Sequence, residues 1–293
     1  MSAPPAPRYR VLFLHPSPAL ANHVVGYVVR RRAGIGPAPA GPAEAVSFPA
    51  NVYSALSIVH RGALRDPATG QLTLSATFSG AMTRPVQREL VDEPEITTVL
   101  LKPGSAARIG RVASHELTNA WVDAEDILSP AEHLEISERV AEQPTIARQI
   151  MVIEQMLLRR IERHALSAEA SSLSALLGSV SSGLARLKVS DLARRAGISE
   201  RQLNRRVLDA LGIGPKMLLR LARVQEVVRI ARELPAQRNP RPLALLARDA
   251  GFADVSHMAK ELQLFTSQPP PLLRERLRQS NLNEWAYELP QDW

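Results

Sequence analysis

The chain has 293 residues, of which 45% are hydrophobic, and a formal net charge of +7. This length is enough for two domains, each with its own core. The sequence contains no cysteine, which excludes disulfides, thiolate metal sites and cysteine nucleophiles. Its N-terminus lacks the charged and then apolar layout of a signal peptide, and no apolar run approaches the roughly 20 residues of a membrane span. We therefore expect a cytoplasmic protein without a membrane partner.

The first half of the sequence predicts an all-β domain. Residues 1–7 read as an irregular leader, and from Tyr9 onwards short β-rich runs alternate with turn residues, as in a small barrel or sandwich. Ala33–Pro42 is predicted to be a surface loop, and the three arginines before it are interpreted as a solvated strand end. The predicted strands are Tyr9–Leu14, His23–Arg30, Tyr53–His60, Gln71–Phe78 and Glu95–Lys102.

Helical spacing replaces the strand pattern after Gly104. The predicted helices are Ser105–Val112, Ser129–Glu142 and Thr145–His164. The last helix carries an apolar stripe, for which packing on the β-domain is favoured and a role as a dimer element is the alternative. Four serines in Ser167–Ser174 indicate a linker and a domain boundary. The stripe consists of Ile146, Ile150, Ile153, Leu157 and Ile161.

The segment Val189–Val207 predicts a helix-turn-helix. Gly197 stands where the first helix must end in a left-handed conformation. Ser199 begins the second helix, and Gln202 is placed to complete a capping box with it. Leu203 and Val207 face inward, which leaves the Arg and Asn side chains of the second helix exposed, as a reader of the DNA major groove requires.

This unit is repeated further along the chain. Leu192–Gly197 recurs as Leu246–Gly251, and beyond the glycine Ser199 corresponds to Asp254. The helix Pro215–Leu234 connects the two units and is about 30 Å long. Successive major-groove faces lie about 34 Å apart, so a connector of this length suits a protein that reads two adjacent grooves.

The positive charge is concentrated in the same region. Residues 186–280 carry 19 Lys and Arg against 9 Asp and Glu, a net charge of +10, which leaves −3 for the rest of the chain. A basic excess alone is usually a solvated surface. An excess confined to a segment with a groove-reading motif indicates neutralisation of DNA phosphates.

These residues resemble the AraC/XylS family of bacterial transcription regulators. The resemblance covers about Leu184–Arg278 and rests on three motifs. They are Leu-Ala-x-x-Ala-Gly-Ile-Ser-x-Arg-Gln-Leu-x-Arg from Leu192, Gly-x-Gly-Pro-Lys from Gly212, and Ala-Gly-Phe-x-Asp-x-Ser-His from Ala250. The second unit departs from the family pattern, because Ser267 stands where a glycine usually ends the recognition helix and Pro269–Pro271 replaces the usual Ser-Pro.

The resemblance implies which residues contact DNA. Base contacts are expected from the second helix of each unit, with the first helix discriminating more sharply because Arg suits guanine and Asn suits adenine. For His257 the alternative is support of the turn or a phosphate contact. The base-contacting candidates are Arg201, Asn204, Arg205, Ser256, His257 and Lys260, and the phosphate-contacting candidates are Ser199, Lys216 and Arg220.

The N-terminal half resembles, through short motifs, the cupin-like domain that accompanies some of these regulators. The motifs are Phe48-Pro49, Ser79-Gly80, Thr83-Arg84-Pro85, Leu101–Gly104 and Glu116–Thr118. The resemblance implies a small-molecule effector pocket, although ordinary packing is the favoured use of the candidate residues. No His-x-His occurs, so a metal site is not predicted. The pocket candidates are Tyr53, Ser57, Phe78 and Arg84.

The predicted fold is α+β. Residues 1–166 form a cupin-like β-barrel domain with trailing helices, 167–183 a linker and first helix, 184–280 an all-α double helix-turn-helix domain, and 281–293 a tail. We expect a nucleoid-associated transcriptional regulator with no cofactor and no enzymatic activity, and double-stranded DNA as its partner. RNA polymerase, an effector and a second copy of the chain are further candidate partners. The alternatives are a regulator whose first domain is only a protein interaction module, and a cupin enzyme fused to a DNA-binding domain.

Overall fold

The computed structural model describes residues 9–32, 44–73, 75–163, 173, 176–177, 181–233 and 242–273. The predicted leader 1–7, the loop Ala33–Pro42, almost all of the serine-rich linker and the tail 281–293 lie outside these residues. None of the described helices is both long and apolar enough to cross a membrane.

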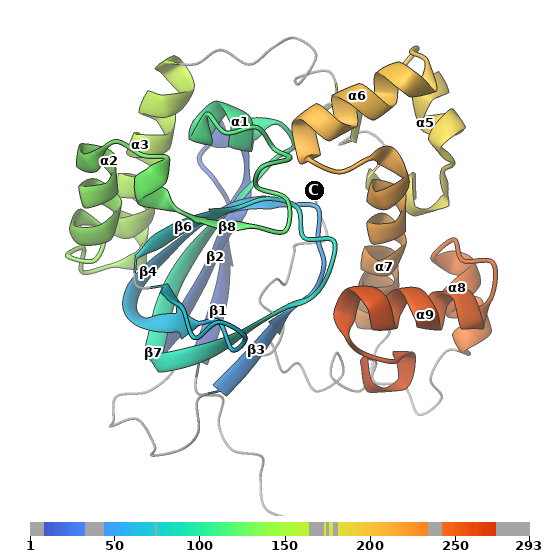
Figure 1. The fold of residues 1–293 in the computed structure, drawn as a ribbon, viewed down its shortest axis with the longest axis horizontal. Coiled ribbons are helices and arrows are strands. Elements are labelled where there is room, and N and C mark those ends of the chain that lie inside the picture. The colour runs from blue at the N-terminus through green and yellow to red at the C-terminus, as the bar shows by residue number, and fades with distance from the viewer. Residues whose placement is uncertain are drawn as a thin grey trace, which may run out of the picture.

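An antiparallel sheet forms the N-terminal half (Figure 1). Its two outermost strands on the main path do not pair with each other, so the sheet is open. The predicted β-domain is confirmed, but it does not close into a barrel. The strands along the path are β1 (Tyr9–Leu14), β2 (Val24–Arg32), β7 (Val86–Leu101), β4 (Ser54–Arg65), β6 (Ala76–Ser79) and β8 (Trp121–Asp123), while β3 (Glu44–Phe48) pairs with β7 and β5 (Leu72–Thr73) with β4.

Alternate side chains of the central strands belong to two different cores. On β7, Val99 and Leu101 are buried in one cluster and Leu100 in another. On β2, Val28 likewise joins the second cluster, whereas its neighbours join the first. Successive strand residues point to opposite faces, so both faces of this sheet are apolar and both need a cover.

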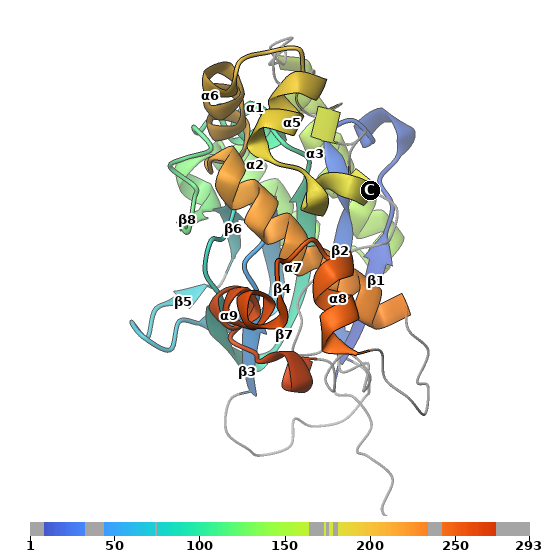
Figure 2. The same cartoon turned by 90° about the vertical axis from the view of Figure 1, so that its right-hand side faces the viewer.

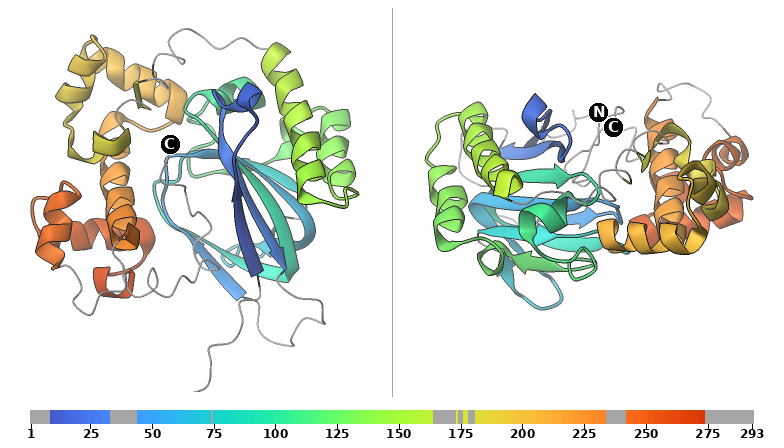
Figure 3. Two further views of the ribbon diagram at one scale, coloured as in Figure 1. Left: turned by 180° about the vertical axis from the view of Figure 1, so that it is seen from behind. Right: turned by 90° about the horizontal axis from the view of Figure 1, so that it is seen from above.

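Helices supply these two covers (Figure 3). One face is covered by α3 (Ile146–Arg163), with α1 (Ser105–Gly110) and α2 (Pro130–Leu134) beside it. Ile150, Ile153, Leu157 and Ile161 of the predicted stripe are buried there, so the stripe packs on the sheet as the favoured interpretation predicts. The opposite face carries the C-terminal helices.

The arginines at the end of β2 are not a solvated strand end, and that interpretation is wrong. Arg30 is only 7% exposed, and its guanidinium lies 4.7 Å from the ring centroid of Tyr9. Arg31 and Arg32 form ion pairs with carboxylates of β7. The reason is the pairing of β2 with β7, which brings acidic residues from far along the chain beside these arginines.

The C-terminal helices follow the predicted order. They are η4 (Ser181–Arg186), α5 (Val189–Arg195), α6 (Glu200–Leu211), α7 (Pro215–Glu233), α8 (Leu243–Asp249) and α9 (Val255–Thr266). The predicted connecting helix is confirmed as α7, and the two helix-turn-helix units are α5 with α6 and α8 with α9.

Burial of His60 on β4 makes the stability of the protein sensitive to acid. Its Nε2 lies 2.8 Å from Oγ1 of Thr97, and burial, with a smaller contribution from Arg31, lowers the pKa of His60 from 6.5 to about 4. The neutral ring is favoured by the fold, so stability is fully present above pH 6.5 and is lost as the pH falls towards the folded pKa.

We expect the free energy of unfolding to fall by about 3 kcal/mol over this range through His60 alone. The variant His60→Gln, which does not titrate, should lose less stability between about pH 7 and about pH 4.5. Urea unfolding at the two pH values measures this difference. Identical pH dependence in both proteins would contradict the assignment.

Candidate nucleic-acid interface

The first helix-turn-helix unit has the local geometry that its sequence predicts. Gly197 adopts a left-handed conformation with φ +64°. The hydroxyl of Ser199 accepts a hydrogen bond from the backbone N–H of Gln202 at 3.2 Å, and the Gln202 side chain accepts one from the backbone N–H of Ser199 at 3.0 Å. The predicted glycine stop and capping box are both confirmed.

The second unit repeats this geometry with different residues. Gly251 has φ +79°, and the Asp254 carboxylate caps α9 by accepting a hydrogen bond from the backbone N–H of His257 at 2.7 Å. At the end of α9, Ser267 adopts φ +57°, the same left-handed conformation as Gly212 at the end of α6. The serine in place of the usual glycine therefore does not change the backbone conformation in which α9 ends, although serine adopts this conformation at a greater energetic cost.

The candidate base-contacting side chains lie on the outer surfaces of α6 and α9. His257 differs from the others because it is half-buried, with its ring packed edge-on against Phe252 at a centroid distance of 5.4 Å. Its placement matches the alternative interpretation, support of the turn. The exposed candidates are Arg201, Asn204, Arg205, Ser256 and Lys260.

The three candidate phosphate contacts are not equivalent. Ser199 and Lys216 are exposed at the starts of α6 and α7. Arg220 instead donates hydrogen bonds of 2.8 and 3.0 Å to the buried carboxylate of Glu261 and lies 4.8 Å from the ring centroid of Phe265. Arg220 thus ties α7 to α9. No local sequence pattern predicts this pairing, because Glu261 lies 41 residues away.

In Figure 1, α6 leads into the start of α7 at the top of the picture and α9 crosses α7 lower down, where Arg220 of α7 pairs with Glu261 of α9. In the perpendicular view α6 and α9 both lie towards the left, with α5 and α8 to their right (Figure 2). The 19 residues of α7 make it about 28 Å long. This arrangement places the two candidate recognition helices, α6 and α9, on the same side of α7.

The four candidate effector residues do not come together. Tyr53 packs in the core that faces the C-terminal helices, Phe78 packs in the opposite core, and Arg84 is exposed. Ser57 alone among them lines a cavity of about 30 Å³ inside the β-domain, beside Arg30. In the described part of the chain, no group of three His, Asp or Glu side chains is arranged to hold a metal ion.

Comparison with known proteins supports the C-terminal assignment. Residues 192–276 match the family model of a helix-turn-helix domain. No curated protein gives a significant match.

Several solved structures share a distant likeness with the chain. The apo K231A variant of ToxT from Vibrio cholerae is 12% identical, with a TM-score of 0.42 over 81% of this chain and 94% of that chain. The DNA-binding domain of AdpA in complex with a target DNA is 21% identical, with a TM-score of 0.33 over 37% of this chain and 95% of that chain. The AraC-like transcriptional activator CuxR is 12% identical, with a TM-score of 0.26 over 73% of this chain and 79% of that chain.

The matched segment contains two capped helix pairs joined by one long helix, and its motifs are those of one family. Residues 192–276 of this chain are therefore a helix-turn-helix domain of the AraC type.

Proposed function

We propose that the protein is a sequence-specific transcriptional regulator that binds double-stranded DNA through α6 and α9. The observation that carries the proposal is the exposure of Arg, Asn and Lys side chains on both helices, each of which follows a glycine-ended helix and has a side-chain N-cap. Helices with these features present their N-terminal residues to base edges in the major groove. The net charge of +10 in residues 186–280 supports binding to a phosphate backbone.

The two helices differ in what they offer to bases. Arg201 and Arg205 on α6 can each pair with guanine, and Asn204 can pair with adenine. On α9 the exposed candidates are Ser256 and Lys260, which discriminate less sharply. We infer that α6 contributes most of the sequence specificity, while Ser199 and Lys216 contact phosphates near helix N-termini.

Loss of Arg205 should therefore cost more specificity than loss of Lys260. On a duplex selected by the unaltered protein from a random-sequence pool, Arg205→Ala is expected to weaken binding by about 5- to 150-fold relative to non-specific DNA. Lys260→Ala should have a smaller effect on this ratio. Fluorescence anisotropy at two salt concentrations separates base contacts from phosphate contacts.

Arg61→Ala provides a matched control for this experiment, because Arg61 is exposed on β4 in the other half of the chain. It removes the same charge and should leave specificity unchanged. The reverse ranking of Arg205 and Lys260 would overturn the assignment of α6 as the main reader. Binding that neither responds to salt nor distinguishes sequences would overturn the proposed function itself.

We propose that the β-domain acts on DNA binding through direct packing on the C-terminal helices. A single hydrophobic cluster contains side chains from both halves of the chain, among them Tyr53, Leu221 and Phe265. The cavity beside Ser57, at about 30 Å³, has room for about two water molecules, so it is too small for an organic effector. RNA polymerase and a second copy of the chain stay as predicted partners.

A further inference from the structure

The β-domain contacts the C-terminal end of each recognition helix. In Figure 1, both α6 and α9 run from α5 and α8 towards the sheet. Three donors from the segment after β7 meet the end of α6. The backbone N–H of Gly104 and the hydroxyl of Ser114 donate to the carbonyl of Ala210 at 3.0 and 3.1 Å. The hydroxyl of Thr118 lies 3.1 Å from the carbonyls of both Gly212 and Ser114, which share its proton.

The end of α9 is held in a similar way. The backbone N–H of Ala50, just after β3, donates a hydrogen bond of 2.8 Å to the carbonyl of Phe265. The last four carbonyls of a helix have no partner within the helix. At the C-terminal ends of α6 and α9, donors of the β-domain form hydrogen bonds with backbone carbonyls that have no partner within the helix.

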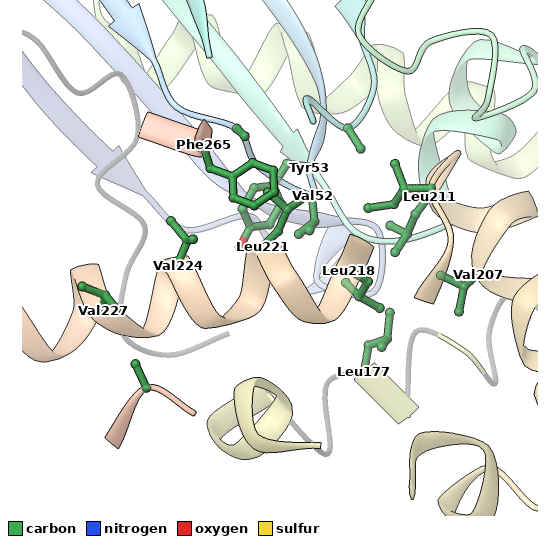
Figure 4. Packing of buried hydrophobic residues seen from close by; sticks show 14 of the residues in the cluster. Val52, Tyr53, Leu177, Val207, Leu211, Leu218, Leu221, Val224, Val227 and Phe265 are labelled. Atoms are coloured by element: carbon green, nitrogen blue, oxygen red, sulfur yellow. The ribbon is translucent and has the colours of Figure 1, made fainter. Parts of the chain in front are cut away.

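Apolar side chains from both halves of the chain pack together in the same contact (Figure 4). Val52 and Tyr53 of the β-domain lie beside Phe265 of α9 and Leu221 of α7, and all four side chains are buried. Near the end of α6, Leu211 is also buried in this cluster. The contact is thus a continuous core with hydrogen bonds to backbone carbonyls at its two ends.

The contact leaves the base-contacting surface open. The candidate side chains Arg201, Arg205, Ser256 and Lys260 are exposed although the β-domain is in place. They lie in the N-terminal halves of α6 and α9, whereas the β-domain holds the C-terminal ends. The docked arrangement does not cover the residues that read DNA.

The turn between α6 and α7 explains why such a contact matters. It contains two glycines in three residues, Gly212 and Gly214, and glycine restricts backbone rotation least of all residues. The bonds from Ser114 and Thr118 fall on Ala210 and Gly212, at the start of this turn. These hydrogen bonds therefore restrain α6 relative to α7 at the turn where the two glycines leave the backbone most freedom to rotate.

We propose that Ser114, Thr118 and the backbone amide of Ala50 are positioning residues, which hold the two recognition helices at one mutual distance and orientation. In this role the β-domain fixes the spacing between the two half-sites that the protein accepts. The proposal rests on the proposed function, since it concerns how DNA is read. A change of one base pair moves a half-site by about 3.4 Å and rotates it by about 35° around the duplex, which a fixed pair of helices cannot follow.

The test uses the full chain with Ser114→Ala and Thr118→Val combined, which removes two donors with little change in shape. A duplex selected by the unaltered protein is remade with one or two base pairs inserted or deleted between its half-sites. The unaltered protein is expected to lose about 10-fold or more in affinity for each altered spacing, and the double variant about 3-fold or less. An identical spacing dependence in the two proteins would overturn the proposal.

The matched control combines Thr69→Val with Ser137→Ala. These hydroxyls lie in the β-domain and make only local hydrogen bonds, so the control should keep the spacing dependence of the unaltered protein. A control that tolerated altered spacing as well as the double variant does would also overturn the proposal.

Hydrogen exchange of the DNA-free proteins separates this proposal from the proposed function. Amides in residues 208–219 should exchange faster in the double variant than in the control, whether or not DNA is the ligand. If exchange increases but no sequence is selected by the unaltered protein, the proposed function fails and the restraint on α6 stands. Unchanged exchange in this segment would overturn the restraint itself.

Discussion

Replacing Arg160 by methionine is expected to lower the free energy of unfolding by about 3–5 kcal/mol, because it leaves a buried carboxylate without its buried charged partner. Arg160 is only 5% exposed on α3, and its Nη1 lies 2.6 Å from Oε2 of Glu132. The same guanidinium donates hydrogen bonds to the backbone carbonyls of Ile109 and Ile127. These contacts join α3 to α1 and α2 beside the sheet.

The response to acid distinguishes this effect from a simple loss of packing. Burial raises the pKa of Glu132, but the backbone N–H and hydroxyl of Ser129, together with Arg160, outweigh it and bring the pKa below its ordinary value. The ionised carboxylate therefore stabilises the unaltered protein at pH values above the ordinary pKa of glutamate, and this contribution is lost as the pH falls through the pKa in the folded state. Without Arg160 the pKa of Glu132 should rise, so the loss should begin at a higher pH.

Urea unfolding at neutral and mildly acidic pH measures both quantities. Arg163→Met is the matched control, because the Arg163 side chain is 62% exposed and lies 3.4 Å from the same carboxylate. It should change stability by only about 0–1 kcal/mol. Adding Glu132→Gln to Arg160→Met should restore part of the loss by removing the buried charge. Equal effects of Arg160→Met and Arg163→Met would show that burial of the pair does not matter.

Gly212→Ala is expected to destabilise the contact between the two halves of the chain much more than Gly197→Ala destabilises the protein. Both glycines have positive φ, +72° and +64°, so each substitution costs about 1–2 kcal/mol in backbone conformation. Nothing lies within 4 Å of a Cβ built on Gly197. A Cβ on Gly212 would lie 2.1 Å from Oγ1 of Thr118 and 2.4 Å from the carbonyl oxygen of Ser114.

The Ser114 carbonyl is backbone and cannot rotate away, so the β-domain has to shift. We expect Gly212→Ala to cost about 1–3 kcal/mol more than Gly197→Ala in the free energy of unfolding. Hydrogen exchange should increase at residues 50–53 and 210–221 in Gly212→Ala only. If both variants lost the same stability with no change at residues 50–53, the packing of the β-domain on α6 would be disproved.

The amino-acid sequence was sufficient to predict the helix-turn-helix units in detail. Gly197, the capping box of Ser199 and Gln202, and the connecting helix from Pro215 are all found where the sequence places them. These features depend on residues within one or two helical turns of each other. Local backbone preference and local hydrogen bonds decide them, and both can be read from a short stretch of sequence.

The strands were predicted where apolar runs are dense and missed where they are not. β3, β8 and the first part of β7 have mixed polar and apolar residues, and pairing with neighbouring strands makes them part of the sheet. Whether the sheet closes also depends on how its strands pair, and here β1 and β8 remain separate edges. Strand pairing joins residues that are far apart in the chain, so no local pattern reveals it.

The contacts that matter most for the proposed regulation were decided by tertiary structure alone. Arg220 pairs with Glu261, and Arg30 is buried instead of solvated. The hydrogen bonds from Ser114 and Thr118 to the end of α6 span more than 90 residues of sequence. Judged from its local sequence, each of these polar side chains would be expected at an exposed position. The fold brings a distant partner close to it, and the energy of a hydrogen bond or ion pair depends on this distance in space.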